Sequence, residues 1–182
     1  GVFLKPPSAY AREGRALLLP RYSRRLEPEV ELGVVLGRAG ADLPVGEALG
    51  HVAGYALCLD MTARDAQAEC RRLGHPWTLA KAFDTSCPVS DLLPKARVPD
   101  PHDLCLWLRV NGALRQRGHT SRMLFPVPHL LSYISRFISL EPGDLVLTGT
   151  PGGVAAVQEH DLLEAGIDGL VTMSFRVERW PR

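Results

Sequence analysis

The sequence lacks several features that mark common classes of protein. It has no apolar run approaching the length of a transmembrane helix and no basic run longer than two residues, so it predicts neither a membrane span nor a nucleic-acid-binding surface. Its four cysteines form no Cys-x-x-Cys pair, which favours reduced thiols over a disulfide framework. None of its six histidines is paired at metal-ligand spacing, and no serine lies in a nucleophile elbow. There is no targeting pattern and no initiator Met, so we expect that residues belonging before Gly1 are missing from this sequence.

The composition is that of one globular domain with a sizeable core. The 182 residues are 46% hydrophobic and 23% charged, with a formal net charge of +1. Short strand-like stretches dominate, and residues 62–73 and 126–137 are the two convincing helices. We therefore predict the α+β class, mainly β, with a mixed sheet and a few peripheral helices. The expected strands are 2–5, 16–19, 29–36, 51–59, 87–92, 104–110, 113–117, 145–147 and 169–177, with a hairpin turn at Asn111-Gly112.

Two glutamates stand in a stretch that otherwise reads as a buried strand. The sequence Glu29-Val30-Glu31-Leu32 continues as Gly-Val-Val-Leu without a break. Because alternate side chains of a strand point to the same side, Glu29 and Glu31 face one way and the two apolar residues face the other. Two carboxylates about 4 Å apart repel by about 4 kcal/mol at an effective dielectric constant of about 20. A cation, a shared proton or open water must offset that repulsion.

A third acid, Asp60, ends the second apolar run, residues 51–59. Taken alone, a Glu-x-Glu pair is more typical of a solvated edge strand. The unbroken apolar continuation and the position of Asp60 before a predicted helix favour burial and a shared site. We infer that Glu29, Glu31 and Asp60 converge on one divalent ion, and a set made only of carboxylates favours Mg²⁺ or Mn²⁺ over Zn²⁺.

Three further places could contribute to a ligand site. Arg64 and Gln67 would share one helix face, where the Arg could bind a carboxylate, but a solvated helix face explains the pair equally well. Lys81 stands among apolar neighbours, so its ammonium is either functional or extended to solvent. The loop at residues 148–153 could present backbone N–H groups to an anion, although a plain turn is the simpler interpretation.

Five motifs are spread along the chain: Phe3-Leu4-Lys5-Pro6, Glu29-x-Glu31-Leu-Gly-Val-Val, Gly54-Tyr55-x-x-x-x-Asp60-Met-Thr-Ala-Arg64-Asp65, Trp77-x-x-Ala-Lys81 and Thr148-Gly149-Thr150-Pro151. Together they resemble the fumarylacetoacetate hydrolase family over essentially the whole length. The stretches ALCLDMTARD and PWTLAK are most similar to its mitochondrial branch of acylpyruvases and oxaloacetate decarboxylases.

The resemblance implies a distorted β-roll core, a homodimer, and Mg²⁺ or Mn²⁺ held by the same three acids. It also implies a pocket for a small 2-oxo acid, lined by Arg64, Gln67, Lys81 and Thr150. A mitochondrial location follows from the same likeness, with the cytosol as a second one.

The implied activities are acylpyruvate hydrolysis and oxaloacetate decarboxylation to pyruvate. The metal would stabilise charge on the 2-oxo oxygen, Lys81 would be the catalytic cation beside it, and Arg64 or Thr150 would hold the far end of the substrate. Hydrolysis also needs a general base for water. We expect one catalytic domain over residues 1–182. We also expect decarboxylation, which needs no attacking water, to be retained better than hydrolysis.

Two departures from the family pattern are visible. The Gly-x-Asn-Tyr-x-x-His-x-x-Glu segment, whose His and Glu activate water on a mobile lid in the family, is not found within residues 1–182, and Gly152 stands where a Lys is common. The alternatives are therefore a catalytically impaired metal-binding or dimerisation module of the same fold, or another family activity such as a hydratase or isomerase.

Overall fold

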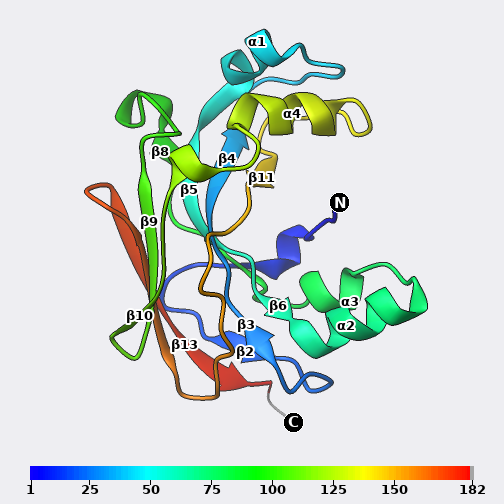
Figure 1. The fold of residues 1–182 in the computed structure, drawn as a ribbon, viewed down its shortest axis with the longest axis vertical. Coiled ribbons are helices and arrows are strands. Elements are labelled where there is room, and N and C mark those ends of the chain that lie inside the picture. Colours follow the sequence, from blue (N-terminus) through cyan, green and yellow to red (C-terminus); the bar gives the residue numbers. More distant parts are fainter. Residues whose placement is uncertain (181–182) are drawn as a thin grey trace.

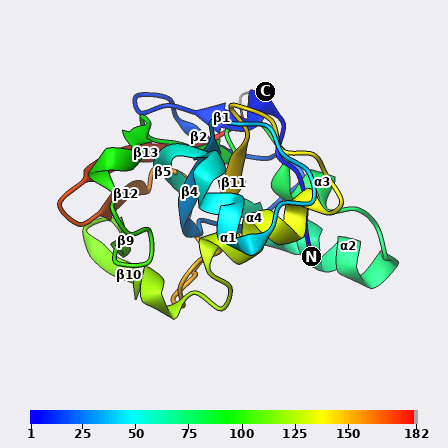
Figure 2. The same cartoon turned by 90° about the horizontal axis from the view of Figure 1, so that it is seen from above.

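The computed structural model describes residues 1–180, so the last two residues of the expected domain, 1–182, lie outside the described part. Most of its regular structure is strand, as the sequence predicted. Two larger sheets face each other, and the helices lie at the ends and on the outer side of the smaller one (Figures 1 and 2). Among residues 1–180, none of the helices has the length and apolar character needed to span a bilayer.

The larger sheet has five strands in the order β10-β9-β12-β13-β2. All its pairs are antiparallel except the parallel pair of β13 with β2. Its strands are β2 (Leu17–Leu19), β9 (Cys105–Val110), β10 (Ala113–His119), β12 (Leu162–Ile167) and β13 (Val171–Arg179). The expected hairpin joins β9 and β10, and Asn111 and Gly112 both have the positive φ that a tight two-residue turn requires.

The second sheet has four antiparallel strands in the order β11-β4-β5-β8. They are β4 (Val30–Leu36), β5 (Val52–Leu59), β8 (Leu93–Pro94) and β11 (Leu145–Leu147). Two short pairs complete the strands: β1 (Tyr10–Ala11) with β7 (Cys87–Pro88), and β3 (Leu26–Glu27) with β6 (Thr62–Ala63). Because β4 lies between β11 and β5, the glutamate-bearing strand is an inner strand, which confirms the preference for burial.

In the described part of the chain, four α-helices lie outside the sheets: α1 (Val45–Ala48), α2 (Arg64–Leu73), α3 (Thr78–Lys81) and α4 (Val127–Ser135). Short 3₁₀ turns cover η1 (Pro7–Ala9), η2 (Leu49–His51), η3 (Lys95–Arg97) and η4 (Thr120–Arg122). In Figure 1, α1 and α4 cover one end of the molecule, and α2 and α3 lie at the other end, beside the β3–β6 pair.

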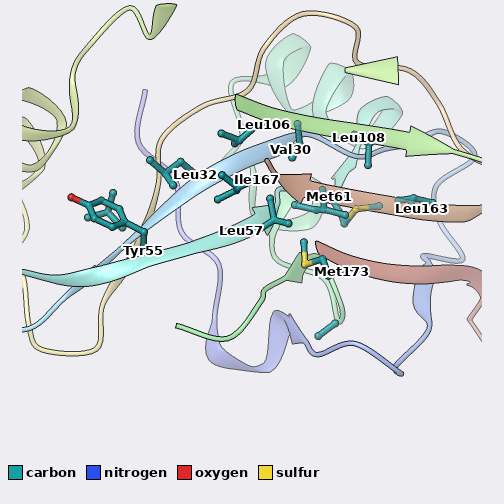
Figure 3. Close-up of a cluster of buried hydrophobic side chains, with 14 of the residues drawn as sticks. Val30, Leu32, Tyr55, Leu57, Met61, Leu106, Leu108, Leu163, Ile167 and Met173 are labelled. Atoms are coloured by element: carbon teal, nitrogen blue, oxygen red, sulfur yellow. The ribbon is translucent and has the colours of Figure 1, made fainter. Parts of the chain in front are cut away.

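The core fills the space between the two larger sheets (Figure 3). Val30 and Leu32 point into it from β4 and are at most 1% exposed. Figure 3 shows them with Leu57 of β5, facing side chains of the other sheet. Alternation along β4 then sends Glu31 to the opposite side, away from the core. The core members labelled there are Val30, Leu32, Tyr55, Leu57, Met61, Leu106, Leu108, Leu163, Ile167 and Met173.

Several expected elements were wrong in detail. Residues 2–5 are not a strand: the first three apolar side chains are exposed, and the backbone is irregular up to η1. The expected strand 87–92 is only two residues long, and β12 was missed because its Glu and Gly break the apolar pattern. The helix predicted from residue 62 begins at Arg64, because Thr62 pairs with β3 and its hydroxyl serves the site described next.

Candidate metal centre

The three acids that the sequence singled out lie together. Glu29 directly precedes β4, Glu31 is in β4, and Asp60 follows β5. The antiparallel pairing of β4 with β5 sets Val30 opposite Leu59, and Asp60 N donates to Glu29 O over 2.8 Å. Each carboxylate offers an oxygen within 4.8 Å of the other two. We call these three residues the acid cluster.

Burial and neighbouring charges act strongly on the carboxyl group of Glu31. Its side chain is buried, and Oε2 accepts the backbone N–H of Gly149 over 2.6 Å. Burial, followed by the negative charge of Asp60, raises the pKa of Glu31 to about 8, against the opposing effects of the Gly149 N–H and Lys81. Without further positive charge, this carboxyl would therefore hold a proton near neutral pH.

Lys81 brings positive charge directly to the acid cluster. It ends the single-turn helix α3, and its side chain is 3% exposed. Nζ lies 2.5 Å from Asp60 Oδ2 and 3.5 Å from Glu29 Oε2, and it donates to Thr62 Oγ1 over 2.7 Å. The ring of Phe3 covers the ammonium at 4.7 Å from its centroid. The interpretation of Lys81 as a solvent-reaching side chain is therefore wrong.

A second buried lysine was missed from the sequence. Lys5 Nζ lies 2.8 Å from Asp60 Oδ1, yet its hydrogens go to the carbonyls of Met61, Lys81 and Ser86. Burial is the main reason that the pKa of Lys5 is lowered, and Asp60 opposes that effect. Asp60 Oδ1 is consequently a buried oxygen that receives no hydrogen bond. The motif that contains Lys5 was recognised, but a single Lys between Leu and Pro carries no signal of its partners.

Arg64 also reaches the acid cluster from the first turn of α2, where Gln67 holds its guanidinium. Arg64 Nη2 donates to Glu29 Oε1 and Nη1 to Gln67 Oε1, each over 2.6 Å. Arg64 Nε donates to Glu27 Oε2, also over 2.6 Å, and Glu27 is 4% exposed. The solvated-face interpretation of this helix start is therefore wrong. Glu27 was missed, although its spacing continues the alternation of Glu29 and Glu31.

The loop after β11 closes the cluster from another side. Thr148 Oγ1 donates to Leu32 O over 2.7 Å, and Thr150 Oγ1 donates to Val30 O over 2.8 Å. These bonds join the loop to β4 and aim the Gly149 N–H at Glu31. The loop therefore presents a backbone N–H to a carboxylate of the protein itself, and it is more than a plain turn.

The donor set fits a hard divalent cation. It consists only of carboxylate oxygens, it is largely buried, and it includes one oxygen with no hydrogen bond and one carboxyl with a strongly raised pKa. Thiolate ligands do not compete, because burial raises the pKa of Cys58 well above its usual value and that of Cys87 to about 12. All four cysteines are free.

The fold and this cluster define a class: mainly β proteins with an acidic, all-oxygen centre between a strand pair and a helix start. The family profile described as Fumarylacetoacetate (FAA) hydrolase C-terminal matches residues 1–178. The chain therefore belongs to the fumarylacetoacetate hydrolase family, as the sequence motifs indicated.

Individual relatives cover nearly the whole chain. A rat protein named oxaloacetate tautomerase FAHD1, mitochondrial, is 62% identical over 178 residues, which are 98% of this chain and 80% of the relative. The human protein of the same name is 58% identical over the same shares. Their names agree with the mitochondrial location expected from the sequence.

A solved structure shares the fold closely. Fumarylpyruvate hydrolase from Pseudomonas aeruginosa, in complex with Mn²⁺ and pyruvate, is 41% identical with a TM-score of 0.92. The match covers 98% of this chain and 78% of that one. The β-roll architecture expected from the sequence is thereby confirmed.

Proposed function

We propose that the chain is a divalent-metal-dependent enzyme acting on small 2-oxo acids, with Glu29, Glu31 and Asp60 as metal ligands and Lys81 as a catalytic residue. The observation that carries this is the acid cluster, in which Asp60 Oδ2 pairs with the Lys81 ammonium while Asp60 Oδ1 is buried and receives no hydrogen bond. Residues 1–182 would form a single catalytic domain. Bound Mg²⁺ or Mn²⁺ would supply Lewis-acid polarisation of the 2-oxo carbonyl.

The activity that the relatives favour is keto–enol tautomerisation of oxaloacetate, because those at 58–62% identity carry that name. This differs from the decarboxylation and hydrolysis expected from the sequence, but the chemistry overlaps. Loss of the C3 proton gives the oxaloacetate enolate, and loss of CO₂ from C4 gives the pyruvate enolate. Both place negative charge on the 2-oxo oxygen, so a site that stabilises one also stabilises the other.

The side chains of the site have distinct tasks in this scheme. The Lys81 ammonium stabilises negative charge at the 2-oxo oxygen and carries a proton that can be given to it. Arg64 binds a substrate carboxylate with its planar fork, and Gln67 fixes the direction of that fork. Thr150 would contact the substrate from the loop, as the family resemblance implies. The burial of Lys81 and Asp60 excludes water and so strengthens these interactions.

The charge of the site favours a doubly negative substrate. Four acids and four bases form one network of ion pairs and close carboxylates: Glu27, Glu29, Glu31 and Asp60 with Lys5, Arg25, Arg64 and Lys81. With every group ionised these charges cancel, and a divalent cation leaves an excess of two positive charges. Oxaloacetate, a dianion, balances that excess better than a monoanionic acylpyruvate such as acetylpyruvate.

Acylpyruvate hydrolysis is the second candidate, supported by the fumarylpyruvate hydrolase structure. Within residues 1–180, no histidine belongs to the charged network, and the fourth acid, Glu27, is paired with two arginines. Hydrolysis would therefore need a general base from elsewhere.

A substrate panel with matched variants tests the proposal. We expect the Mg²⁺-loaded protein to speed enol-to-keto conversion of oxaloacetate, measured by loss of enol absorbance, and Glu31→Gln to lower this rate at least 100-fold. Glu69→Gln on the exposed face of α2 is the matched control and should leave the rate unchanged. Equal rates for wild type and Glu31→Gln would refute the proposal. Pyruvate release from oxaloacetate and from acetylpyruvate then ranks the C–C cleavages.

We also propose that the chain forms a homodimer. Besides the family resemblance, large apolar side chains are exposed on and around α4, namely Leu124, Phe125, Tyr133, Phe137 and Ile138. Light scattering should give twice the chain mass for wild type and a lower mass for Phe137→Asp. A monomeric wild type at micromolar concentration would contradict this.

A further inference from the structure

Gln116 is a buried amide that neither the family motifs nor the acid cluster includes. It is 1% exposed and is the only buried residue of β10. The register of β10 on β9 shifts between Leu114 and Gln116, so Arg115 is an extra residue, as in a β-bulge. The bulge turns Gln116 inward, toward the second sheet.

The carboxamide of Gln116 is held by three hydrogen bonds. Oε1 accepts the Val30 N–H over 3.0 Å, and Nε2 donates to Pro151 O and to Thr150 Oγ1, each over 2.8 Å. The Val30 N–H can only donate and the Pro151 carbonyl can only accept, so these two partners fix which end of the amide is nitrogen. Val30 stands between Glu29 and Glu31, so Gln116 ties the metal-ligand strand to the loop that carries Thr150.

These contacts also fix the hydroxyl of Thr150. Its hydrogen goes to Val30 O, and one of its two lone pairs accepts the Gln116 N–H. One lone pair remains for a ligand. Thr150 is partly exposed, and the N–H of its neighbour Gly149 donates to Glu31 of the acid cluster, so the loop that carries this hydroxyl adjoins the site.

Strand β10 and the loop that carries Thr150 approach each other closely beside Gln116. A Cβ on Gly118 of β10 would stand 2.5 Å from Pro151 Cβ, and one on Gly153 would stand 2.1 Å from Arg115 O. Gly153 also has a φ of +101°, which side chains rarely adopt. The two glycines let the bulged strand lie directly against the loop, which supports the hydrogen bonds of Gln116.

We propose that Gln116 is a positioning residue that fixes the direction of the Thr150 hydroxyl, so that this hydroxyl meets a bound 2-oxo acid only as a hydrogen-bond acceptor. A ligand group that carries a hydrogen, such as an enol O–H, is then favoured over a carbonyl or carboxylate oxygen at this position. The inference rests on the proposed function and specifies it: the site selects the enol form through Thr150.

Two ligands of similar size separate this role from a purely structural one. Oxalate offers only acceptors, whereas oxamate carries N–H donors. We expect calorimetry on the Mn²⁺-loaded protein to show that Gln116→Met lowers the affinity for oxamate relative to oxalate by about 5- to 10-fold, the size of one hydrogen bond. The reason is that Thr150, freed from the amide, can rotate and donate to oxalate. Gln158→Met, at an exposed glutamine, is the matched control and should keep the wild-type ratio.

The variant Gln116→Glu supplies a rescue. A protonated carboxyl has one hydrogen, which can replace the amide hydrogen donated to Thr150, and an ionised carboxylate has none to donate. We expect the oxamate-to-oxalate ratio of Gln116→Glu to approach wild type at pH 5.5 and to fall by pH 8. The Gln116→Met ratio at each pH corrects for other effects of pH on the site and for the titration of the ligands themselves.

The outcomes are distinct. If wild type binds both ligands and Gln116→Met weakens both equally, or only lowers Tm, Gln116 is structural and the inference is overturned. If Mn²⁺-loaded wild type binds neither ligand, the proposed function fails and the inference fails with it. A selective loss for oxamate, restored at low pH in Gln116→Glu, supports it.

Discussion

Lys81 and Asp60 form the shortest ion pair of the acid cluster, with Nζ 2.5 Å from Oδ2 and both side chains 3% exposed. The two residues come from different elements, since Asp60 follows β5 and Lys81 ends α3. Removing one partner of such a pair leaves a buried charge, which is more costly than losing both partners. The pair therefore couples the stability of the fold to the charge state of the site.

The first prediction concerns Lys81→Met. We expect at least a 100-fold loss of turnover on oxaloacetate, because the cation beside the developing negative charge is removed. The metal-free variant should also lose about 3 kcal/mol of unfolding free energy, and added Mg²⁺ should recover part of that loss. Denaturant titration with and without Mg²⁺ measures this. Lys95→Met, at an exposed lysine, is the control, and similar stabilities for the two variants would contradict the prediction.

The second prediction concerns pH. Glu31 titrates at about 8 in the folded metal-free chain and near 4.5 when unfolded, so the folded state holds the extra proton between these values. The contribution of Glu31 to the unfolding free energy of the metal-free protein should therefore fall as the pH rises from about 5 to 8. Tm measured across that range should show the decline in wild type and a weaker one in Glu31→Gln. A decline of equal slope in both proteins would rule out Glu31 as its source.

Metal binding should release that same proton. At pH 7, calorimetric titration with Mg²⁺ in buffers of different ionisation enthalpy should give close to one proton released in wild type, because a cation favours the ionised carboxylate. Glu31→Asp, which keeps a carboxyl, should still release a proton if it binds. No dependence on buffer in wild type would mean that Glu31 is already ionised.

The fourth prediction concerns Glu27→Gln. Glu27 holds Arg64 Nε, so its neutral variant should leave the fork of Arg64 less well directed and nearer to Glu29. We expect KM for oxaloacetate to rise about 10-fold with a smaller change in kcat, the size of one charge-assisted hydrogen bond. Steady-state kinetics measure the two separately. A fall in kcat with KM unchanged would place Glu27 in the chemical step instead.

The residues that sequence reasoning found are those whose signal is local. Alternation along one strand put Glu29 and Glu31 on one side, and the end of the next strand added Asp60. Lys5 and Gln116 were missed because their partners lie 34 or more positions away along the chain. Gln116 also depends on a β-bulge, which no periodic pattern reveals. The start of α2 was misplaced because a threonine that normally caps a helix is used by the site.

The strand β4 has two roles in this fold, since it presents Val30 and Leu32 to the core on one side and, on the other, Glu31 of the proposed metal centre, with Glu29 directly before it. A small shift of β4 therefore moves its core-facing and its site-facing side chains together. Substitutions on the apolar face of β4 can thus abolish the enzymatic activity while the protein stays folded. We therefore expect that some variants without activity will carry substitutions at aliphatic positions that contact no ligand.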